Sequence, residues 1–96
     1  MAEIPSRVTG QTSSTGALGP VAVYGFATLS LKFAGAGTVV HQRSFDAGAT
    51  WVDVATLTEA SSADELQSNI FEAGSQVLHR LNVTDASAAI DYFLGV

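Results

Sequence analysis

Histidines and carboxylates are the side chains of this sequence that could carry acid–base or metal chemistry, since cysteine is absent. His41 and His79 fall on different predicted strands, and two histidines with no third ligand nearby make a weak metal site. His79 alternates with apolar Val77 and Leu81, so we interpret it as a core or interface histidine. We therefore expect no metal and no other cofactor.

The nine acidic residues show no spacing that forces two carboxylates together, as glycoside hydrolysis requires. Asp46 falls in a predicted turn, Asp53 and Asp91 fall on predicted strands, and the others lie in predicted loops. No serine stands in a nucleophile-elbow sequence, and neither glycine-rich phosphate-binding motif is present. The sequence thus predicts a protein that is not an enzyme.

The sharpest local motif spans residues 44–51, which read Ser-Phe-Asp-Ala-Gly-Ala-Thr-Trp and fit the pattern S-x-D-x-G-x-T-W. It resembles the Asp-box, a hairpin turn of sialidase-like propellers and other β-proteins. In such a turn an aspartate accepts backbone N–H groups, glycine supplies a positive φ, and the aromatic ring packs on the hairpin. The motif occurs once, in a chain too short for a propeller, so we predict a structural turn and no glycosidase activity. Its defining residues are Ser44, Asp46, Gly48, Thr50 and Trp51.

Apolar and polar residues alternate with a period of two through most of the chain, which predicts β-strands. About seven short strands separated by turns predict an all-β fold, an antiparallel β-sandwich or small barrel of the jelly-roll type. The expected strands cover residues 21–33 with a bend at Gly25, 38–45, 50–57, 66–71, 76–84 and 88–94. A loop is expected over residues 59–65, and an α+β fold with a helix over 59–70 is the alternative.

The first part of the chain differs in composition from the rest. Residues 1–19 are rich in Ser, Thr and Gly, which predicts a flexible N-terminal arm. The β-sandwich domain is expected over residues 20–96. We expect the arm to contribute little to the core and to reach a neighbouring molecule, since its backbone can add to a sheet edge.

Charge and hydropathy exclude several classes of partner. The formal net charge is −5, and the four basic residues are scattered, so neither nucleic acid nor an anionic membrane surface is expected to bind. No apolar run approaches the about 18 residues of a transmembrane helix. The first seven residues lack the pattern of a signal peptide, which predicts synthesis in a cytoplasm. With 47% hydrophobic and only 14% charged residues, part of the surface is expected to be covered by a partner.

The stretch from about residue 35 to residue 96 resembles short structural proteins of tailed-bacteriophage particles. The resemblance rests on the hairpin of residues 43–51, on Glu72-Ala73-Gly74 followed by Arg80-Leu81-Asn82-Val83-Thr84, and on the final Ile90-Asp91-Tyr92-Phe93-Leu94-Gly95. The chain departs from that pattern at residues 85–88, where Ser/Thr-Gly is usual. The resemblance implies a multi-copy virion component: a capsid decoration (cement) protein that binds the major capsid protein or another virion protein, or a tail, collar or fibre part. It implies synthesis in the host cytoplasm and residence in the virion.

Two predicted strands near the C-terminus have apolar residues on both faces, and a domain this small cannot cover both. A closed symmetric oligomer would provide the cover, so we expect a homotrimer. The candidate interface comprises Val77, Leu78, His79, Tyr92 and Phe93. A carbohydrate-binding module is a further alternative, and an exposed aromatic platform would distinguish it.

Overall fold

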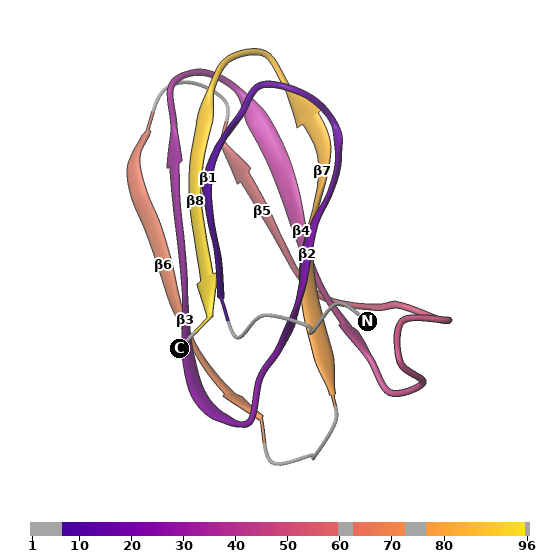
Figure 1. Cartoon of the computed structure of the whole chain (residues 1–96). Coiled ribbons are helices and arrows are strands. Elements are labelled where there is room, and N and C mark those ends of the chain that lie inside the picture. Colours follow the sequence, from indigo (N-terminus) through magenta and orange to yellow (C-terminus); the bar gives the residue numbers. More distant parts are fainter. Residues whose placement is uncertain (1–6, 60–62, 73–76, 96) are drawn as a thin grey trace.

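The computed structural model describes residues 7–59, 63–72 and 77–95, with only the backbone described for residues 63–69. This part of the chain contains strands and turns and no helix, so the all-β prediction is confirmed (Figure 1). The strands are β1 (Arg7–Thr12), β2 (Gly16–Ala22), β3 (Gly25–Phe33), β4 (Gly37–Ser44), β5 (Val52–Glu59), β6 (Ala63–Glu72), β7 (Leu78–Ala86) and β8 (Ile90–Gly95).

The strands form two four-stranded antiparallel sheets, with the orders β1-β8-β3-β6 and β2-β7-β4-β5. Every connection crosses from one sheet to the other except the β4–β5 hairpin. The pairs β1–β8, β2–β7, β3–β6 and β4–β5 are those of one long antiparallel hairpin folded over on itself. This strand arrangement is a jelly roll, and the predicted β-sandwich is therefore confirmed.

Period-two alternation builds the core between the sheets. Along β3 the residues Ala27, Leu29, Leu31 and Phe33 are buried, and the residues between them face outward or are half-buried. The same pattern on neighbouring strands completes a core of buried side chains: Val21, Val23, Val39, Ile70, Leu81, Val83, Ile90 and Leu94.

The predicted N-terminal arm is corrected for residues 7–19. Residues 7–12 form β1, which pairs with β8, and residues 16–22 form β2, which pairs with β7. The Ser/Thr/Gly composition hides this pairing, because ladder hydrogen bonds use backbone groups that every residue but proline provides. Val8 and Leu18 supply the inward-facing contacts and pack against the core. Residues 1–6 lie outside the described residues.

The region between β5 and β6 differs from its prediction as well. β5 continues to Glu59, and β6 already begins at Ala63, where a loop was expected. Backbone pairing with β3 extends over most of β6, from Phe33–Ala63 to Gly25–Glu72, so the helix alternative is wrong for residues 63–70. Ladder pairing with a central strand outweighs the helix-friendly composition of this segment. Residues 60–62 lie outside the described residues.

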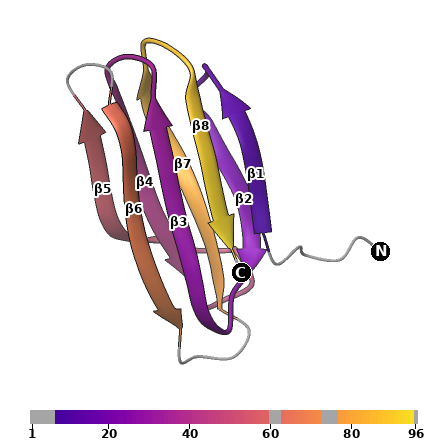
Figure 2. The same ribbon diagram turned by 90° about the vertical axis from the view of Figure 1, so that its left-hand side faces the viewer.

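The two long sides of the sandwich differ. β1 and β2 lie next to each other along one side, whereas β5 and β6 are the outer strands of their sheets along the other (Figure 2). Side chains of β5 and β6 line a cleft that enters between the sheets on this side. The fold thus leaves one side open, and the charged residues described next lie there.

Candidate functional site

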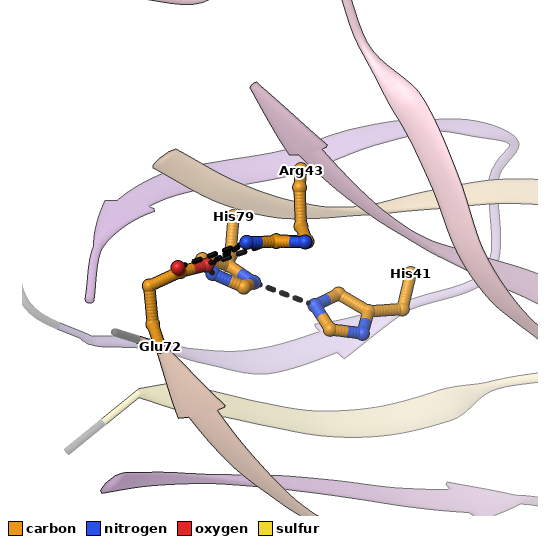
Figure 3. A network of polar contacts seen from close by, with 4 residues as sticks. All are labelled: His41, Arg43, Glu72 and His79. Atoms are coloured by element: carbon orange, nitrogen blue, oxygen red, sulfur yellow. Dashed lines mark hydrogen bonds and ion pairs between the residues drawn. The ribbon is translucent and has the colours of Figure 1, made fainter. Parts of the chain in front are cut away.

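Four polar side chains form a connected chain of hydrogen bonds inside the sandwich (Figure 3). The Arg43 guanidinium donates from Nε and Nη2 to the two carboxylate oxygens of Glu72, at 2.9 Å each. His79 Nε2 lies 2.8 Å from Glu72 Oε1, and His41 Nε2 lies 2.8 Å from His79 Nδ1. The hydrogen bonds therefore link the four side chains in the order Arg43, Glu72, His79, His41.

Both sheets contribute to this network. His41 and Arg43 lie on β4, and Arg43 is directly opposite His79 of β7 in the same sheet. Glu72 is the last residue of β6 and belongs to the other sheet. The network is thus a polar tie between the two sheets, beside the apolar core that they share.

Burial and hydrogen bonding fix the protonation of the two rings. The side chains of Glu72 and His79 are 3% and 1% exposed, His41 is 4% exposed, and Arg43 is one-third exposed. An ionised carboxylate only accepts hydrogen bonds, so His79 Nε2 donates to it. His79 Nδ1 must then accept the hydrogen bond that His41 Nε2 donates, which leaves a lone pair on His41 Nδ1.

The same burial keeps both imidazoles neutral. Burial is the main cause that lowers the pKa of His41 from its ordinary 6.5 to about 4, and the nearby His79 and Arg43 add to the effect. Burial also lowers the pKa of His79, although its hydrogen bond to Glu72 opposes this. The network therefore holds one ion pair and two uncharged rings at neutral pH.

A cleft of about 360 Å³ lies beside the network. Side chains of both sheets line it: Leu29, His41, Arg43, Val54, Ala55, Leu57, Ile70, Phe71, Glu72 and His79. These described lining residues include no hydroxyl, thiol or amine that could act as a nucleophile. In the described part of the chain no group of three or more His, Asp or Glu side chains is placed to hold a metal ion. The polar groups of the described lining are therefore His41, Arg43, Glu72 and His79, among apolar side chains.

The predicted turn between β4 and β5 has a dense set of local hydrogen bonds. Ser44 Oγ accepts the Gly48 N–H at 2.8 Å and donates to Asp46 Oδ1 at 2.8 Å. The same Asp46 oxygen accepts the Thr50 N–H at 2.8 Å, and this bond is the main cause that lowers the pKa of Asp46. Gly48 has a φ of 93°. The sequence motif anticipated the acceptor role of Asp46, but Ser44, which is fully buried, takes part equally.

The aromatic residue of the turn packs against a side chain of its own sheet. The Arg80 guanidinium lies 4.3 Å from the centroid of the Trp51 ring, and Arg80 Nε donates to Gln42 Oε1 at 2.7 Å. These contacts hold the turn against β4 and β7. They are structural, and the turn shares no residue with the lining of the cleft.

The five residues predicted for an interface fall into two groups. Val77, Leu78 and His79 are buried within the chain itself, so the prediction of an interface there is corrected. Their two-sided apolar pattern arises because β7 is a central strand that is covered on both faces. One face packs on the core between the sheets, and the turn after β4 approaches the other face at Leu78. Tyr92 and Phe93 are half-buried: Tyr92 packs against the core, whereas Phe93 lies on the outer face of the β1-β8-β3-β6 sheet, at a shallow hollow.

Exposed large apolar side chains gather at one end of the sandwich, which we call the aromatic end. They are Tyr24, Phe26, Phe45, Val52, Val54 and Phe71. All six lie where β3 and β5 begin, where β4 and β6 end, or in the connections between these strands. The Phe26 and Phe71 rings, opposite each other on β3 and β6, have centroids 4.9 Å apart. Sequence patterns missed this surface, because its residues come from several strands and connections that become neighbours only in the folded chain.

The histidine network also escaped the sequence reasoning, which placed His41 and His79 on different strands and predicted no contact between them. One signal was available: His41 has the same parity as the buried Val39. The pairing partner Glu72 could not be found this way, since it comes from the other sheet and its contact depends on the folded topology.

Comparisons of the chain with protein-family models, curated proteins and solved structures find no match. The resemblance to phage structural proteins therefore stays a prediction. Among the described residues there is no helix of the length and apolarity needed to cross a membrane.

Proposed function

We propose that the protein is a multi-copy structural protein of a virus particle, of the capsid-decoration or cement type. It would act without catalysis, as a homotrimer that binds the major capsid protein or another virion protein. The motifs quoted above for residues 43–51, 72–84 and 90–95 point to this class. The jelly roll is compatible with it, since capsid proteins are among the proteins that use this fold.

The aromatic end is the observation that carries the proposal. Phe26 is 77% exposed, Tyr24 is 74% exposed and Phe71 is 64% exposed. Burial of each ring away from water would lower the free energy. Contiguous exposed apolar groups mark surfaces that bind other proteins, and aromatic residues are enriched at the centres of such interfaces. We therefore place the contact surface at this end rather than at Val77, Leu78 and His79.

Light scattering of the purified chain tests the assembly part of the proposal. The wild type should have the mass of a trimer, and the double variant Phe26→Ser, Phe71→Ser should be monomeric and still folded, because both rings are exposed. Ala17→Ser, an exposed change far from this end, is the control and should remain trimeric. A wild-type monomer at high concentration that also fails to bind any virion protein would refute the proposal.

A tail, collar or fibre component is the alternative within the same class. The same surface would serve it, so the distinction lies in copy number. A decoration protein should match the number of shell lattice sites in purified particles, whereas a tail component should be present in the few copies set by tail symmetry.

A carbohydrate-binding module is the second candidate, and the exposed rings of Tyr24, Phe26 and Phe71 favour it. Aromatic rings in water can stack on the apolar face of a sugar. Retention on insoluble cellulose or chitin, lost in Phe26→Ser, would support this function. Absence of retention together with trimer formation would favour the structural role.

A further inference from the structure

The lone pair on His41 Nδ1 has no hydrogen-bond partner within the described part of the chain. In that part, every fully buried polar side-chain atom has a partner. His41 Nδ1 must therefore reach accessible surface, and the cleft is the surface that His41 lines. The cleft thus presents the Nδ1 lone pair of His41 as a hydrogen-bond acceptor, and the hydrogen bonds from His41 to His79 and from His79 to Glu72 fix the protonation of this ring.

The other walls determine what kind of molecule would fit. Leu29, Leu57 and Ile70 form an apolar interior, and Val54 and Phe71 are exposed enough to form its rim. The positive charge of Arg43 is already matched by both oxygens of Glu72, so the described lining of the cleft has no unbalanced charge to attract an anion. A volume of about 360 Å³ lies within the usual range of small-molecule pockets.

We propose that the cleft binds a small neutral molecule with an apolar body and one hydroxyl group, of the phenol or alcohol class. The hydroxyl donates its hydrogen bond to His41 Nδ1, and the carbon body lies between the sheets on the side of β5 and β6. Such a site goes beyond the structural role, because it is complete within one copy of the chain.

Two probes that differ by one hydroxyl test this assignment. Titration of the full-length, ¹⁵N-labelled protein with p-cresol or toluene at pH 7 gives both affinities and the ¹⁵N shift of His41 Nδ1. We expect p-cresol to bind about two- to tenfold more tightly than toluene, because its hydroxyl group adds one hydrogen bond to the complex. Only p-cresol should shift His41 Nδ1. Equal affinities, or shifts confined to residues outside the cleft, would overturn the proposal.

Two exposed valines on β5 provide a matched pair of variants. Val54 lines the cleft and Val52 does not, and both are about half exposed, so tryptophan at either position should be tolerated. Val54→Trp should abolish p-cresol binding, whereas Val52→Trp should retain it; equal binding by the two variants would place the ligand elsewhere. His41→Phe should make p-cresol and toluene bind equally, if that variant folds. Trimer formation without p-cresol binding would refute the ligand site and leave the assembly proposal intact.

Discussion

The two ends of the sandwich are built from the same strands but differ sharply in chemistry. The aromatic end holds the exposed rings and valines, and the histidine network lies near it, at the end of β6 and the start of β7. The opposite end, which we call the small-residue end, has connections over residues 13–15, 34–36 and 87–89, made of Ser, Thr, Gly and Ala. Backbone hydrogen bonds link two of these connections, with Ala34 N–H donating to Ala89 O at 2.9 Å and Ser87 N–H donating to Ala36 O at 3.0 Å.

This contrast distinguishes the residues that reverse the chain from those that the fold does not require. Short connections of small residues are enough to turn the chain, as the small-residue end shows. Buried charge and exposed rings at the other end contribute nothing to chain reversal and are unfavourable by themselves. Their presence there points to function, and variants at the two ends should respond very differently.

The largest effect is expected for Glu72→Ala. This change leaves Arg43 and His79 without their shared acceptor and opens a space between the sheets. Removal of one partner from a buried ion pair destabilises by about 3–5 kcal/mol. Asp85→Ala, an exposed acid far from the network, is the control and should change the free energy of unfolding by less than about 0.5 kcal/mol in urea titrations. Similar values for the two variants would show that Glu72 is not a structural tie.

Acid should destabilise the fold through the histidine network at this same end of the sandwich. The pKa of His41 is about 4 in the folded chain and 6.5 when unfolded, so the unfolded state binds more protons between these values. The stabilisation is fully present above pH 6.5 and is lost as the pH falls towards 4. The loss at pH 4 should be about 3 kcal/mol, from 1.36 kcal/mol for each pKa unit. The lowered pKa of His79 acts in the same direction.

Denaturant unfolding measured from pH 7 to pH 4 checks this dependence. Acidic groups also titrate towards the lower limit, so His41→Phe provides the reference. The variant should lose less stability than the wild type between pH 6.5 and pH 5, a range in which the carboxylates contribute little. Parallel curves for the two proteins over that range would contradict the assignment of His41 as a buried neutral ring.

The comparison also shows how far sequence reasoning reaches. Alternation predicted the inward faces of β3 and β8, since period two is a local property of the chain. The turn after β4 was predicted because its donors and acceptors all lie within residues 44–50. The network was not predicted, since His41, Glu72 and His79 meet only after two sheets have packed.

The aromatic end and the first two strands were missed for different reasons. Alternation puts Phe26 on the parity of Thr28 and Ser30, but its contact with Phe71 arises only when β3 pairs with β6. β1 and β2 have few apolar residues, and their pairing with β8 and β7 depends on backbone groups that composition does not reveal.

A smaller effect is expected in the turn after β4, for Ser44→Ala. Ser44 is fully buried, and its hydroxyl accepts the Gly48 N–H and donates to Asp46. Loss of such a buried group destabilises by about 1–2 kcal/mol. Asp46→Ala should lower the melting temperature less, because its carboxylate is open to water that can replace it. Calorimetry of both variants measures the difference, and a larger effect of Asp46→Ala would show that the exposed carboxylate is the main support of the turn.

The smallest effect is expected at the small-residue end, for Ser87→Ala. The Ser87 hydroxyl donates to Ala36 O at 2.7 Å, but the bond is exposed, and the backbone N–H of Ser87 donates to the same oxygen. Water can replace the hydroxyl, and the backbone bond remains, so the free energy of unfolding should change by less than about 0.5 kcal/mol. The oligomeric mass and the affinity for p-cresol should both be unchanged, because the aromatic end and the cleft contain no residue of this connection. A change in either property would mean that the small-residue end takes part in binding, and the division of the sandwich into a folding end and a functional end would then be wrong.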